Sequence, residues 1–75
     1  MSSIMMQGRG FGGLAADSII RNATTEGELM RLVAAFKIFL EATVALKRRE
    51  EGEEIAWAFH HAARAALTER IPLCA

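Results

Sequence analysis

The apolar residues between positions 25 and 71 form two helical stripes that fall out of phase at Gly52. The first stripe occupies an arc of about 70° when each residue turns the helix by about 100°. Its members are Leu29, Leu32, Val33, Phe36, Phe39, Leu40, Thr43 and Val44. The second stripe consists of Ile55, Phe59, Ala62, Ala63 and Ala66. One uninterrupted helix would place the two stripes on roughly opposite sides. The pattern therefore predicts a turn at Gly52 and a helical hairpin, with helices over about 26–50 and 53–71.

Residues at the expected helix ends support this hairpin. Thr25 and Glu28 form a capping-box pattern, in which the Thr25 hydroxyl accepts from the Glu28 amide and the Glu28 carboxylate reaches back to the Thr25 amide. Gly52 can adopt the left-handed backbone that ends a helix, and Pro72 stops the second helix because the residue before a proline avoids helical angles. Residues 47–54, however, are mostly good helix formers, and a glycine inside a helix costs only about 1 kcal/mol. A continuous helix is therefore the alternative.

The segment before the hairpin is expected to have two parts. Residues 1–13 contain four of the six glycines and show no periodicity, which predicts a flexible Gly/Met-rich arm. Phe11 and the two methionines at 5 and 6 are expected to anchor this arm on the rest of the protein or on the neighbouring chain. Residues 14–23 have apolar side chains at helical spacing, which predicts a short helix. Residues 14–75 are then a single helical domain, and the fold class is all-α.

The amount of apolar sequence predicts self-association. Hydrophobic residues make up 52% of the 75 residues, more than so small a domain can hide in one core. Ile38 projects away from the first stripe with Ala34 and Ala45 beside it, so that this helix is apolar on more than one side, as buried helices are. Single exposed apolar residues are normal, but this excess favours a homo-oligomer. The simplest form is a dimer that pairs two hairpins into a four-helix-bundle-like core.

Charge narrows the choice of partners. The formal net charge is zero, so no overall field attracts nucleic acid or an anionic membrane. The single arginine–glycine sequence at 8–13 resembles segments that contact RNA, but one copy is too little to predict binding. No apolar run has the length of a membrane-spanning helix, residues 4–6 are too short for a signal-peptide core, and the one cysteine, Cys74, excludes an intramolecular disulfide. We expect a cytoplasmic protein that binds neither nucleic acid nor membrane.

One candidate binding surface lies on the second helix of the hairpin. Trp57, His60 and Arg64 share a face at i, i+3 and i+7, with His61 beside it, and this face points away from the apolar stripe. These side chains can stack on and hydrogen-bond a flat or anionic ligand, and Trp and Arg are also preferred anchors of protein interfaces. Three interpretations remain open. The residues fill a dimer interface or cover the N-terminal arm, they contact a partner protein, or they bind a small anionic or nucleotide-like ligand.

The sequence gives no basis for catalysis. Adjacent His60 and His61 point about 100° apart on a helix and cannot chelate one metal together. The repeated Glu-x-x-His pattern of di-metal bundles is absent, and no serine has an indicated His/Asp partner. We therefore expect a non-enzyme without catalytic residues, metal or cofactor. The leading hypothesis is a small homo-oligomeric helical protein that acts as an adaptor or inhibitor of another macromolecule. The alternative is an oligomer that binds a small ligand.

Overall fold

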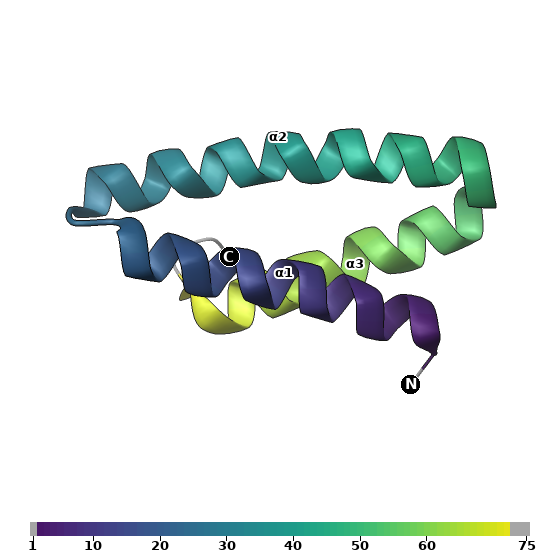
Figure 1. Cartoon of the computed structure of the whole chain (residues 1–75), viewed down its shortest axis with the longest axis horizontal. Helices are drawn as coiled ribbons and strands as arrows, with labels where there is room; N and C mark the ends of the chain where they lie inside the picture. Colours follow the sequence, from purple (N-terminus) through teal and green to yellow (C-terminus); the bar gives the residue numbers. More distant parts are fainter. Residues whose placement is uncertain (1, 73–75) are drawn as a thin grey trace.

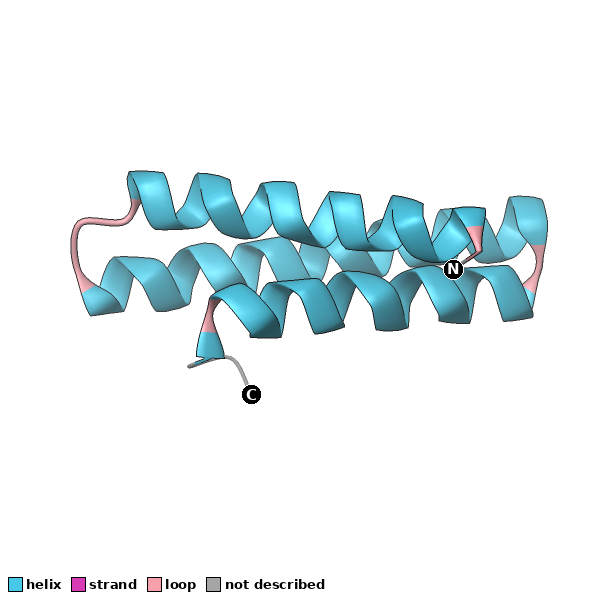
Figure 2. Cartoon of the chain, turned by 90° about the horizontal axis from the view of Figure 1, so that it is seen from below, coloured by secondary structure: helices cyan, strands magenta, loops and turns pink. Residues whose placement is uncertain are grey.

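The computed structural model describes residues 2–72 and is helical over almost all of that stretch. Its helices are α1 (Ser3–Asn22), α2 (Glu26–Glu51) and α3 (Glu53–Arg70). α1 and α3 run in the same direction and α2 runs against both, with α2 along the top of the view in Figure 1. The helices lie side by side in an elongated bundle that measures 38 × 23 × 18 Å (Figure 2). No strand occurs in residues 2–72, and the all-α prediction is confirmed.

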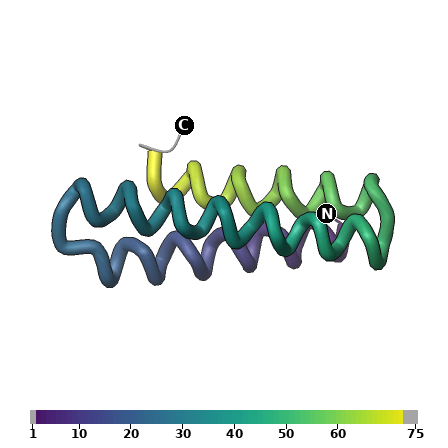
Figure 3. The backbone as a smooth tube through the Cα atoms, turned by 90° about the horizontal axis from the view of Figure 1, so that it is seen from above, coloured from purple at the N-terminus to yellow at the C-terminus, as the bar shows by residue number. Residues whose placement is uncertain are grey.

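A single residue, Gly52, separates α2 from α3 and confirms the predicted hairpin turn (Figure 3). Its backbone has φ 100° and ψ 166°, a combination that essentially only glycine adopts. The Gly52 amide donates to the Arg48 carbonyl, and the Gly52 carbonyl accepts from the Ala56 amide, both at 3.1 Å. An ion pair of 2.8 Å between Arg48 and Glu53 spans the turn. The last turn of α2 and the first turn of α3 are therefore both closed by hydrogen bonds.

The N-terminus of α2 has the predicted capping box, with one difference. The Thr25 hydroxyl accepts from the Glu28 amide at 3.0 Å, and the Thr25 backbone is extended, as expected before a helix. The Glu28 carboxylate accepts from the amide of Thr24, at 3.1 Å, rather than from that of Thr25. These two contacts determine where α2 begins after the short connection from α1.

The glycine-rich N-terminal segment is helical, and the prediction of a loop there is wrong. Residues 3–13 are the first half of α1, and the expected short helix over 14–23 is the second half of the same 20-residue helix. The hydroxyl of Ser2 caps this helix by accepting from the Met5 amide at 3.3 Å. Phe11 anchors the segment as expected, whereas the Met6 side chain is 62% exposed.

The glycines of α1 allow it to lie very close to α3. A Cβ atom at Gly12 would overlap the carbonyl oxygen of Ala63, and one at Gly8 would lie 2.7 Å from the carbonyl oxygen of Phe59. Two ion pairs flank this contact. Arg9 donates to Glu69 at 2.6 and 3.1 Å, and Arg70 donates to Asp17 at 3.1 Å. Glycine in this segment therefore provides close helix packing rather than flexibility.

The core consists of two clusters that follow each other along the bundle and share Phe36. The first contains Ala16, Ile19, Val33, Leu67 and Ile71, and the second contains Leu40, Val44, Ala56, Phe59 and Ala63. The Phe11 ring lies 5.4 Å from that of Phe36 and 5.3 Å from that of Phe59, measured between centroids. α1 thus completes the second cluster.

The predicted stripes are correct in part. Leu40 and Phe59 are buried and Phe36 is half-buried, but Phe39 is 59% exposed. On α3, Ala56 is fully buried whereas Ile55 is 37% exposed. The other four residues predicted for the second stripe are Phe59, Ala62, Ala63 and Ala66, and all are buried. The predicted face of α3 is therefore correct except at Ile55.

Candidate functional site

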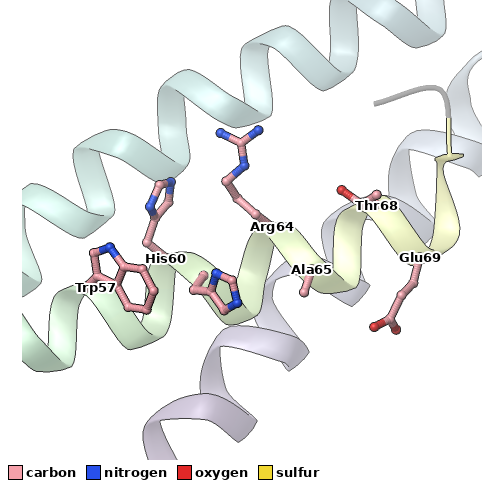
Figure 4. A pocket seen from close by; sticks show the side chains of 7 residues that line it. Trp57, His60, Arg64, Ala65, Thr68 and Glu69 are labelled. Carbon is pink, nitrogen blue, oxygen red and sulfur yellow. The ribbon is translucent and has the colours of Figure 1, made fainter. Parts of the chain in front are cut away.

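The predicted recognition residues lie together on α3, and Figure 4 shows them with the neighbouring helices. Because α3 buries Ala56 and Phe59, the side chain of Trp57 projects outward, away from the bundle. Trp57 is 61% exposed. The glycines of α1 pack against the side of α3 that carries Phe59, Ala62 and Ala63, so Trp57 does not cover the N-terminal segment. This excludes the interpretation in which Trp57 covers the N-terminal arm.

The Trp57 ring is held by His61, one helical turn further along α3. The two ring centroids are 5.0 Å apart and the ring planes are 6° from parallel. The helical spacing grouped Trp57 with His60 and placed His61 beside them, whereas in the structure Trp57 stacks on His61. This stack restricts the indole orientation before any partner arrives.

His60 and Arg64 point toward α2 in Figure 4. His60 lines a hollow between the two helices together with Glu41, Val44 and Arg48. Partial burial, followed by the nearby positive charge of Arg64, lowers the pKa of His60 below its usual 6.5, and Glu41 opposes this shift. The neutral imidazole is therefore the form that the folded chain favours. His60 belongs to the α2–α3 contact as much as to the outer surface.

One hollow at this face is open and has a volume of about 610 Å³. Its lining residues are Trp57, His60, His61, Arg64, Ala65, Thr68 and Glu69. Arg64 forms no ion pair with another side chain in residues 2–72. Glu69, in contrast, is bound to Arg9, and this hydrogen bond lowers the pKa of the Glu69 carboxyl. Arg64 is thus the cation that this surface offers to a partner.

The surface has an acidic extension that was not predicted from the sequence. A second open hollow, of about 690 Å³, lies at the hairpin turn and shares Trp57 with the first. Its lining residues are Glu51, Gly52, Glu53, Glu54, Ile55 and Trp57. The signal was present in the sequence, because Glu53 and Glu54 precede Trp57 by four and three residues, which is the spacing of helix neighbours. Trp57 therefore lies between an acidic rim and a basic one.

Within residues 2–72, no group of three or more His, Cys, Asp or Glu side chains could hold a metal ion; Cys74 lies outside the described residues. None of the helices in that part is long and apolar enough to cross a bilayer.

Comparison with known proteins gives no match to a protein family, to a curated protein or to a solved structure.

Proposed function

We propose that this chain is a small homo-oligomeric helical protein that binds another macromolecule, as an adaptor or inhibitor, through the outer face of α3. The observation that carries the proposal is the exposed Trp57 ring stacked on His61. An aromatic side chain offers roughly 150–250 Å² of contact area. Because the stack already orients the ring, binding costs little side-chain entropy.

The charges around Trp57 indicate the chemistry of the partner. Glu53 and Glu54 lie between Trp57 and the hairpin turn, and Arg64 lies on the opposite side of Trp57. A central aromatic anchor with a polar rim is the usual arrangement of a binding hot spot. The complementary surface is a protein segment that places an apolar side chain on Trp57, a cation toward Glu54 and a carboxylate toward Arg64.

The test is affinity capture from the native cell with matched variants. We expect Trp57→Ala to weaken binding of the captured protein by roughly 30-fold, which corresponds to about 2 kcal/mol for a hot-spot residue, and Arg64→Ala to weaken it less. Arg21→Ala, an exposed arginine at the end of α1, is the control and should bind normally. Circular dichroism must show equal helicity for all three. A partner held equally by wild type and Trp57→Ala would contradict the proposal.

The second candidate function is capture of a small flat anion, which the hollow of about 610 Å³ beside Arg64 favours. A ligand of this kind raises the free energy of unfolding by about 2.7 kcal/mol at one hundred times its dissociation constant. Thermal unfolding with a panel of nucleotides and aromatic acids distinguishes the two functions. A concentration-dependent stabilisation that Arg64→Ala abolishes would favour the ligand function. Indifference to the whole panel, with capture as above, would favour the macromolecular partner.

A further inference from the structure

The longest helix, α2, has a second apolar face that points to solvent. The core side of α2 carries Val33, Leu40 and Val44. The residues on the other side, here named the outer stripe of α2, are all exposed. They are Ala34, Ala35, Ile38, Phe39, Ala42, Ala45 and Leu46. The stripe extends over about 20 Å of helix at 1.5 Å per residue.

The outer stripe contains no charge. Between positions 34 and 46, the charged residues are Lys37 and Glu41. They are four residues apart, on the flank of α2 that faces α3, where Glu41 lines a hollow with His60. Ile38 is 71% exposed and Leu46 50%. Phe39, at the edge of the stripe next to α1, is 59% exposed, and one part of its ring stacks on that of Phe11 with the centroids 5.7 Å apart. A contiguous apolar surface of this kind marks an interaction site in a protein of this size.

Small and large side chains alternate along the stripe in a way that suits a second copy of the same helix. Ala35 and Ala42 are seven residues apart on its centre line, the spacing of a coiled-coil seam. Ile38 lies on one side of this line, and Phe39 and Leu46 lie on the other. Alanines on the centre line allow a facing helix to approach toward the short end of the usual 8–10 Å separation.

Antiparallel pairing makes this surface complementary to itself. With a two-fold axis near position 40, Ile38 of one copy faces Ala42 of the other and Leu46 faces Ala34, so that these two large side chains each meet a small one. Parallel pairing would instead place Ile38 against Ile38. The ends of the stripe carry Glu28 and Arg31 on one side and Arg49 and Glu50 on the other. Antiparallel pairing brings Glu28 within about one helical turn of Arg49 of the other copy, and Glu50 within one turn of Arg31. It also places Arg31 opposite Arg49, so that the preference for antiparallel pairing rests on the fit of large and small side chains.

We propose that two copies of this chain pair through the outer stripe of α2, antiparallel about a two-fold axis near position 40. The inference deepens the homo-oligomeric part of the proposed function and is independent of what the α3 face binds. It places two α2 helices at the centre of six helices, because α1 of each copy is part of its bundle. This differs from the four-helix-bundle-like core expected from the sequence.

The first test is the mass of the full chain in solution. Light scattering or sedimentation should give twice the chain mass of 8.2 kDa at tens of micromolar. Ile38→Glu should weaken pairing by roughly 100-fold or more, because two unpaired carboxylates would be buried in the interface, while helicity and monomer folding are retained. Ile20→Glu, the same change at a 50% exposed isoleucine on α1, should remain a dimer. A monomer mass for the wild type across dilution, or an unchanged dimer of Ile38→Glu, would overturn the proposal.

The second test determines the direction of the helices. In a Cys74→Ser background, the double variant Ala35→Cys and Ala45→Cys should form a disulfide between copies under mild oxidation, because these positions face each other in the antiparallel pair. Ala35→Cys alone should not cross-link. Efficient cross-linking of Ala35→Cys alone would show a parallel pair and refute the antiparallel arrangement. Partner capture by the α3 face is measured separately, so that failure of one proposal is distinguishable from failure of the other.

Discussion

Replacing Gly12 by alanine tests the close contact between α1 and α3. The added Cβ would overlap the carbonyl oxygen of Ala63 and lie 2.9 Å from its Cα. Because these atoms belong to the backbone of α3, no side-chain movement can relieve the overlap, and one helix must move away from the other. That movement would loosen the packing of Ala16 and Ala63, both fully buried. We therefore expect Gly12→Ala to destabilise the protein.

The magnitude follows from two opposing contributions. Alanine is about 1 kcal/mol more favourable than glycine inside a helix, and overpacking costs about 1–3 kcal/mol. Because the overlap at Gly12 is with backbone atoms, we expect its cost at the upper end of that range. Gly12→Ala should therefore lower the free energy of unfolding by about 2 kcal/mol. At Gly10, a Cβ would meet nothing within 4 Å, and Gly10→Ala should gain about 1 kcal/mol. The two variants should then differ in melting temperature by about 12–24 °C, at about 4–8 °C per kcal/mol for a domain of this size.

Thermal unfolding followed by circular dichroism, with urea unfolding as a second measure, tests this pair. Gly10→Ala is the matched control, because it makes the same substitution in the same helix two residues away. The difference between the two melting temperatures therefore reports helix packing and not helix propensity. Equal stabilisation by both variants would refute the close approach of α1 to α3. No effect of either would refute the helical state of this segment.

Three further changes test other parts of the structure. Gly52→Ala should lower the free energy of unfolding by about 1–3 kcal/mol because of its positive φ, and a raised melting temperature would instead indicate a continuous helix. Phe59→Ala should cost about 3–5 kcal/mol, enough to unfold much of so small a protein, and full helicity of this variant would contradict the core. Because the pKa of His60 is below 6.5 in the folded chain, the unfolded chain binds more protons as the pH falls, and stability should decrease below about pH 6.5. His60→Gln should flatten this part of the pH dependence of urea unfolding, and an unchanged slope would exclude His60 as its cause.

The hairpin could be predicted from the sequence because its signals are local. Gly52 ends one helix and begins the next through its own backbone, and Thr25 caps α2 with its own side chain. The first half of α1 could not be predicted in the same way. Each glycine lowers the stability of a helix by about 1 kcal/mol relative to alanine. The contact with α3, which the local sequence does not reveal, offsets this loss. The available signal was the four-residue spacing of Gly8, Gly12 and Ala16, which places small residues on one helix face.

The sequence groups the residues of the candidate surface on α3 but does not give their arrangement relative to one another. Periodicity places Trp57, His60 and Arg64 on the outside of α3, because it needs only the 100° turn per residue. It does not choose between His60 at i+3 and His61 at i+4 for the stack on Trp57, because both spacings bring side chains together on a helix. Alanine fits both a buried and an exposed position, and so the sequence of the alanine-rich α3 does not show that Ala56 is buried and Ile55 exposed. It also does not show that His60 lines the hollow between α2 and α3.

The outer stripe of α2 and the Trp57 face of α3 are separate surfaces, divided by the charged flank that carries Glu41 and Arg48. A dimer paired through the stripe would therefore leave two Trp57 faces open. Two linked sites bind a partner with two epitopes more tightly than one site does, through effective concentration alone.

This separation leads to a last prediction, which joins the two proposals. Ile38→Glu should leave the affinity for a single-epitope fragment of the partner unchanged, because Trp57 is untouched. It should weaken retention on a surface coated densely with that fragment by about 10²-fold or more, the usual range for avidity. Biolayer interferometry at low and high coating density measures both quantities on the same protein. Equal loss at both densities would show that the stripe itself contacts the partner, and no loss at either would show that the dimer does not engage two sites at once.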